Sequence, residues 1–125
     1  MAGMAEWWRL EELPELEPPF EVLELRPGEE KVFTVIDYKL GKAVIHPRWP
    51  GAPSEKEVAV LRLYVPREEK EFFPYYYDVA SKRLIAQLIT ILREADVPRH
   101  KVKIRVKKEG VPPKAYFAVT VLAVE

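Results

Sequence analysis

The sequence predicts an α+β domain in which an antiparallel sheet of about five to six strands packs on one long helix, with a short N-terminal helical arm. Several segments alternate apolar and polar residues with a period of two, which is typical of half-buried strands. One segment, residues 79–95, contains neither Gly nor Pro and places its apolar residues at helical spacing. A chain of 125 residues that is 48% hydrophobic is large enough to bury the core of one such domain.

The first 19 residues are expected to form an acidic, proline-rich arm, and residues 20–125 a single α+β domain. Residues 4–13 predict a short helix in this arm. Pro14 ends that helix, because proline lacks the amide hydrogen that a helix interior needs.

The segments between the arm and the long helix predict a meander of antiparallel strands. Residues 26–29 (Arg-Pro-Gly-Glu) have the composition of a tight turn, and Gly41 marks a second turn. Three prolines exclude the loop at residues 46–54 from any central strand. The strands expected here are residues 20–25, 31–38, 42–46 and 57–65.

A capping residue predicts where the helix begins, and alternation of apolar and polar residues predicts two strands after it. Asp78 is the expected N-cap of the helix, and Pro98 lies just beyond its end. Residues 101–107 alternate strictly, so three apolar side chains are expected to face the core while four cations face away. The inward-facing residues of this strand are Val102, Ile104 and Val106, and the last strand of the hairpin is expected at residues 115–124.

Composition excludes several classes of protein. The chain has no cysteine, which excludes disulfides, thiolate zinc sites and a cysteine nucleophile. No apolar run reaches the roughly 18 residues that a membrane span needs, and no signal peptide is visible, so we expect no membrane association and a cytoplasmic location. Dense charge with no Asn and a single Gln is typical of hyperthermophilic proteins.

Catalytic motifs are scarce, and we expect neither an enzyme nor a cofactor. His46 and His100 lie far apart and lack the spacing of a metal site, and no glycine-rich phosphate loop is present. A hydrolase that binds a metal through Asp37, His46 or Asp78 is kept as a minor alternative.

The strongest feature is the row of cations on residues 101–107. Charge is distributed unevenly, since residues 1–30 carry a net charge of −7 and residues 82–125 a net charge of +6. Like charges along a strand repel one another, so either the acidic arm covers the row or a phosphate backbone does. The two interpretations carry about equal weight. The cations of the row are Lys101, Lys103, Arg105 and Lys107.

Aromatic residues cluster beside cations, as they do in proteins that bind single-stranded nucleic acid. In residues 72–77 (Phe-Phe-Pro-Tyr-Tyr-Tyr) we expect the two phenylalanines in the core and at least one tyrosine exposed. Cations at the start of the predicted helix and in the loop of the last hairpin would add contacts to phosphates. The further candidate binding residues are Lys82, Arg83, Lys114, Tyr116, Tyr76, Tyr77, Arg48 and Trp49.

Residues 73–88 (FPYYYDVASKRLIAQL) and 110–119 (GVPPKAYFAV) resemble small archaeal proteins related to ThermoDBP, the single-stranded-DNA-binding protein of some hyperthermophilic archaea. The resemblance covers about half of the chain. It implies a sheet packed against helices, bases held in an apolar cleft with basic flanks, and an oligomer. It carries over no individual binding residue.

The sequence therefore predicts a non-enzymatic binder of single-stranded DNA, with RNA as a possible ligand, and with little sequence specificity. The alternative is a protein-interaction or assembly module whose acidic, Trp-bearing arm docks on the basic strand. We also expect a homodimer, because Trp7 and Trp8 are adjacent on a short arm and one core-facing stripe cannot easily bury both.

Overall fold

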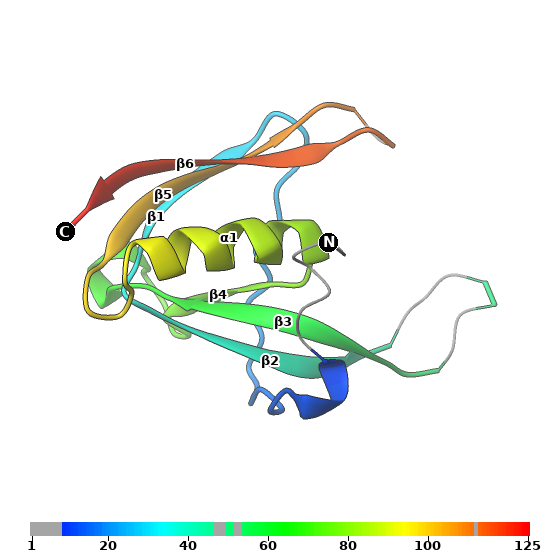
Figure 1. Ribbon diagram of the computed structural model, residues 1–125. Coiled ribbons are helices and arrows are strands. Elements are labelled where there is room, and N and C mark those ends of the chain that lie inside the picture. The colour runs from blue at the N-terminus through cyan, green and yellow to red at the C-terminus, as the bar shows by residue number, and fades with distance from the viewer. Residues whose placement is uncertain (1–8, 47–49, 52–53, 112) are drawn as a thin grey trace.

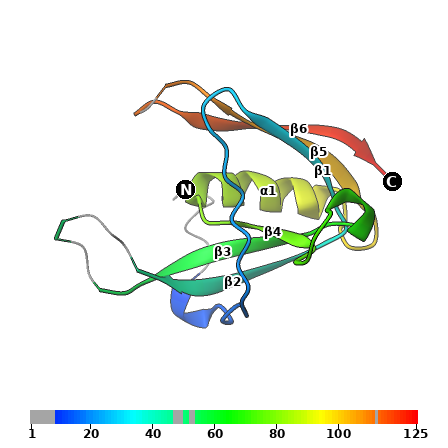
Figure 2. The same cartoon turned by 180° about the vertical axis from the view of Figure 1, so that it is seen from behind.

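The computed structural model describes residues 9–46, 50–51, 54–111 and 113–125. These residues form an α+β fold in which a single helix lies between two three-stranded antiparallel sheets (Figures 1 and 2). The expectation of one sheet packed on one long helix is therefore wrong. The helix has 13 residues, and the strands divide into a β2-β3-β4 sheet on one side of it and a β1-β5-β6 sheet on the other.

The described elements follow one another in the order strand, strand, strand, strand, helix, strand, strand, with short 3-10 turns near the start and before β4. None of the described helices is long and apolar enough to cross a membrane. The bounds are η2 Leu10–Glu12, β1 Glu30–Val35, β2 Asp37–Ile45, β3 Lys56–Tyr64, η3 Arg67–Glu69, β4 Tyr76–Val79, α1 Lys82–Glu94, β5 Val102–Glu109 and β6 Tyr116–Val124.

The chain changes sheet at Ile36, between β1 and β2. β1 pairs with β5, whereas β2 pairs with β3, and the Ile36 amide donates to the carbonyl of Tyr64 at the joint. Alternation continues across the joint, so the sequence cannot show that two sheets meet there. The predicted turn at Gly41 is wrong, because β2 runs straight through this residue.

The helix α1 begins later than the sequence suggested. Ser81, not Asp78, is its N-cap, and the Ser81 hydroxyl accepts a hydrogen bond from the Leu84 amide at 3.4 Å. The apolar stripe of α1 is wide because both sheets pack on it. The buried helix residues are Leu84, Ile85, Leu88, Ile89 and Leu92, and the facing strands contribute Leu61, Leu63, Val102, Ile104 and Val106.

The segment from Pro14 to Val22 crosses the outer face of the β2-β3-β4 sheet and joins both of its edges. Glu15 forms a bridge with Lys42 on β2, and Val22 forms a bridge with Asp78 on β4. The predicted strand at residues 20–25 is therefore wrong, since only this single bridge forms there. We call residues 14–22 the strap.

The described part of the predicted arm is packed against the body of the fold. Leu16 of the strap is buried with Ala43 and Val60, which gives the outer face of the β2-β3-β4 sheet a small core of its own. Gly41 makes this packing possible, because a Cβ there would lie 2.7 Å from the Pro14 carbonyl oxygen and 2.6 Å from the Leu16 side chain.

Candidate nucleic-acid interface

The outer face of the β1-β5-β6 sheet carries the predicted row of cations. Lys103 and Arg105 are exposed and Lys107 is half-buried, while the intervening residues of β5 are fully buried against the helix. The alternation of residues 101–107 thus produces the inward and outward faces that it predicts. Lys101 is also exposed, just before β5 begins.

Acidic neighbours neutralise part of this row. Arg105 pairs with Glu30 of β1 at 2.9 Å, and Lys107 pairs with Glu109 at 3.5 Å. Lys101 and Lys103 form no side-chain ion pair or hydrogen bond with the residues that the structure describes. The face therefore keeps its uncompensated charge at the end of β5 where Lys103 lies.

Tyr116 lies on the same outer face, opposite Glu109 in the β5–β6 ladder. Its ring is 52% exposed. Its hydroxyl donates to Glu109 Oε2 at 3.0 Å, and this hydrogen bond, together with the negative charge of Glu109, raises the pKa of the Tyr116 phenol. The hydrogen bond to Glu109 holds the Tyr116 ring on the outer face of the sheet, where it faces solvent.

The other predicted cations lie elsewhere. Lys82 and Arg83 are exposed in the first turn of α1, which packs on the inner face of the β1-β5-β6 sheet, so they do not share a face with Lys103. Lys114 is exposed in the hairpin loop before β6. Arg48 and Trp49 lie outside the described residues, as do Trp7 and Trp8.

The described part of the arm does not cover the cation row. Residues 9–19 lie on the β2-β3-β4 side of the molecule, and the cation row lies on the opposite side, beyond the helix (Figure 1). Within one chain, then, the acidic residues of the strap do not neutralise Lys101 or Lys103.

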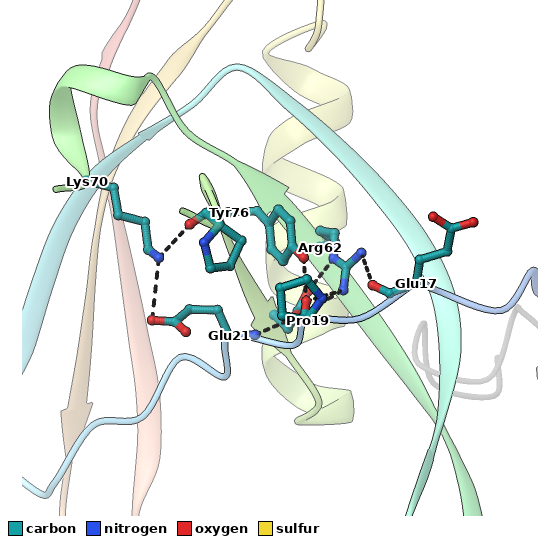
Figure 3. A network of polar contacts seen from close by, with 8 residues as sticks. Glu17, Pro19, Glu21, Arg62, Lys70 and Tyr76 are labelled. Carbon is teal, nitrogen blue, oxygen red and sulfur yellow. Dashed lines mark hydrogen bonds and ion pairs between the residues drawn. The ribbon is translucent and has the colours of Figure 1, made fainter. Parts of the chain in front are cut away.

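Tyr76 and Tyr77 are buried, and neither ring offers a stacking surface. The expectation of exposed rings at these positions is wrong because β4 is covered on both faces. The Tyr77 ring packs on Phe33 of β1, with ring centroids 5.1 Å apart. The Tyr76 ring lies under the strap, where its hydroxyl donates to the Pro19 carbonyl (Figure 3).

Phe72 and Phe73 are exposed aromatic residues that the sequence did not indicate as a binding surface. The two side chains are 72% and 68% exposed, whereas the sequence suggested that both belong to the core. Their loop is attached to the free edge of β1, where Glu69 Oε1 accepts a hydrogen bond from the Thr34 amide at 2.7 Å. Thr34 is the direct ladder partner of Lys103, so this loop borders the uncompensated end of the cation row.

A buried ion pair fixes the strap to its sheet (Figure 3). Arg62 Nε donates to Asp78 Oδ1 at 2.8 Å, and both side chains are almost completely buried. The second carboxylate oxygen accepts from the Glu21 amide at 2.9 Å. The Arg62 guanidinium also donates to the Glu17 and Pro19 carbonyls, so the pair ties the strap to two strands at once.

The rings of Phe20 and Tyr76 complete the surroundings of Arg62. The guanidinium carbon lies 4.0 Å from the centroid of the Tyr76 ring and 5.3 Å from that of Phe20. Burial acts to lower the pKa of Arg62, but the hydrogen bonds and negative charge of Asp78 outweigh it and raise that pKa. The arginine therefore stays charged, and its role is to hold the strap in place.

Replacing Tyr76 with phenylalanine is expected to change how stability depends on pH. Burial raises the pKa of Tyr76 above its ordinary value of 10.0 and outweighs the charge of Arg62, which acts to lower it. The unfolded chain therefore loses this proton first, so the Tyr76 contribution is complete below pH 10.0 and falls as pH rises further. Tyr76→Phe should cost about 1 kcal/mol at neutral pH through the lost hydrogen bond, and this deficit should shrink in alkali.

Guanidinium chloride unfolding of both proteins across a series of pH values, from neutral to strongly alkaline, measures this difference. Two stability curves that stay parallel over the whole range would contradict the assignment of a raised pKa to Tyr76.

No metal site is formed by the described residues, in which no group of three His, Asp or Glu side chains is close enough to hold an ion. Asp37 begins β2, and His46 follows directly after its other end. Asp78 is occupied by Arg62. The residues named for the hydrolase alternative are therefore not brought together.

Comparison with protein-family models, with curated proteins and with solved structures finds no match to this chain.

Proposed function

We propose that the protein binds single-stranded nucleic acid, DNA or RNA, on the outer face of the β1-β5-β6 sheet. The observation that carries the proposal is the exposed row of cations on β5, beside a solvent-facing tyrosine and left uncovered by the described part of the arm. A ligand of this kind is found inside cells, which supports a cytoplasmic location.

Phosphates are contacted by Lys101 and Lys103, whose charges have no acidic partner among the described residues. Each phosphate that a cation neutralises releases counterions, so affinity falls as salt rises. Arg105 and Lys107 contribute less, because binding competes with their pairs to Glu30 and Glu109.

Bases stack on exposed rings at the two ends of the face. Tyr116 offers one ring beside Lys107, and the loop bearing Phe72 and Phe73 offers two more beside the edge of β1. Base–aromatic stacking contributes about 1–3 kcal/mol per base and tolerates any sequence. Selectivity stays low, because the chain has no Asn and a single Gln with which to read base edges.

Titration of a fluorescently labelled oligo(dT) at several salt concentrations, followed by anisotropy, tests the proposal. The affinity of the natural chain is expected to fall with salt, and Lys103→Ala should weaken binding and reduce the salt slope by about 1. The matched control is Lys39→Ala, which removes an exposed lysine from β2 in the other sheet and should change neither quantity.

The same titration distinguishes the contribution of base stacking to affinity from that of phosphate contacts. The double substitution Phe72→Ala and Phe73→Ala should weaken binding about tenfold or more while leaving the salt slope unchanged. The proposed function is refuted if the natural chain does not bind at low salt, or binds with an affinity that is indifferent to salt.

A further inference from the structure

Among the described residues, the chain itself contacts three of the four sheet edges. The strap pairs with two of them, and a single side-chain hydrogen bond reaches the third. On the β2-β3-β4 sheet, the strap pairs with the β2 edge at Lys42 and with the β4 edge at Asp78. On the other sheet, Glu69 binds the Thr34 amide on the β1 edge. The fourth edge, the outer side of β6, pairs with no strand among the residues that the structure describes.

The sequence of β6 lacks the usual protection of an exposed edge. Its nine residues, YFAVTVLAV, include no charge and no proline, although edge strands normally carry such residues to prevent pairing with another chain. A register shift opposite Lys103 and Ile104 disturbs one end of β6, but the ladder is regular from Tyr116 to Val121.

Apolar side chains are exposed on both faces of this strand. On the helix side, Val121 and Val124 lie opposite buried residues of β5 and are 44% and 52% exposed. On the outer face, the Tyr116 ring is 52% exposed. A partner that covers this edge must therefore bring apolar side chains on both faces of a neutral strand. β6 of a second copy meets that requirement.

We propose that two copies of the chain associate by antiparallel pairing of their β6 edges. The contact is two-fold symmetric, so β6 meets itself with no like charges opposed. In an antiparallel pair, the start of each β6 strand lies beside the end of its partner. Lys114, just before β6, then lies near the partner's Glu125, just after it. This flanking charge complementarity favours a second copy over an acidic or basic peptide.

The two sheets then join into one, with both outer faces on the same side. The cation rows of the two copies lie on one continuous surface, with the paired β6 strands between them. The association itself does not depend on the proposed ligand, so it is tested without nucleic acid.

Light scattering coupled to size exclusion, at tens of micromolar protein, gives the test. The natural chain should have twice the monomer mass of 14.5 kDa. Val121→Lys should convert it to monomer, because it places a charge from each copy within an apolar contact. The matched control is Val32→Lys, which makes the same change at a residue of β1 that is 43% exposed and should leave the dimer intact.

Circular dichroism of both variants verifies that they are folded. If Val121→Lys does not fold, Leu122→Lys serves as a second variant of the β6 edge. Hydrogen exchange gives an independent readout, because the edge amides of β6 should become more protected as protein concentration rises. A monomeric natural chain overturns the proposal. A dimer that survives both β6 substitutions also overturns it. If deletion of residues 1–8 alone abolishes the dimer, the contact is at Trp7 and Trp8, which likewise overturns the proposal.

Discussion

Replacing Asp78 with alanine should lower the free energy of unfolding by about 3–5 kcal/mol, because it leaves the charge of Arg62 buried without its partner. The two side chains are 5% and 2% exposed, and their closest contact is 2.8 Å. The substitution also removes the acceptor of the Glu21 amide, so the strap loses one of its attachments to β4.

The matched control for this prediction is Glu30→Ala, which breaks the pair with Arg105. That pair has nearly the same separation, 2.9 Å, but both side chains are close to half-exposed. Exposed pairs contribute about 0–1 kcal/mol, so the control should change stability little. Denaturant unfolding measures both variants, and equal losses for the two would show that burial of the Arg62–Asp78 pair has no special role.

Replacing Gly41 with valine should destabilise the fold by about 3 kcal/mol, by forcing the strap off the sheet. A Cβ at this position would lie 2.7 Å from the backbone carbonyl oxygen of Pro14, which cannot move away without breaking its hydrogen bond to the Lys42 amide. The loss combines the burial of Leu16 with the strap's two hydrogen bonds to Lys42.

A double-mutant cycle distinguishes release of the strap from a merely local clash. Leu16→Ala should cost about 2–5 kcal/mol in the natural chain, as for other buried leucines. In the Gly41→Val protein it should cost much less, because Leu16 has already left its site. Additive effects of the two substitutions would mean that the strap stays docked and that the clash is relieved elsewhere.

The elements that the sequence predicts correctly are those fixed by local pattern. Alternation in residues 57–65 and 101–107 corresponds to β3 and to most of β5, and apolar spacing locates the helix. The division into two sheets was missed because pairing is non-local and the break at Ile36 is a single residue within a continuous run of alternation. Nothing in the local pattern distinguishes a bent strand from two strands.

In the candidate site, too, the sequence predicted what local pattern decides and missed what distant segments decide. The cation row was predicted because alternation alone decides which side chains of β5 face outward. Arg62 gave no such signal, since a lone arginine in an alternating strand is normally solvent-exposed, and here a distant segment buries it. In the aromatic run at residues 72–77, the phenylalanines expected in the core are exposed and two tyrosines expected to be exposed are buried. The reason is that β4 is buried on both faces while the loop before it is exposed.

The joint at Ile36 has a consequence for the order in which the chain can fold. Residues 37–79 complete the β2-β3-β4 sheet within one contiguous stretch, so this sheet and α1 can form early. β1 has no partner until β5 exists, because Glu30 pairs with Lys107 far along the chain. Closing so long a loop is entropically costly and slow. During synthesis on the ribosome, β1 must therefore wait, unpaired, until most of the chain has emerged.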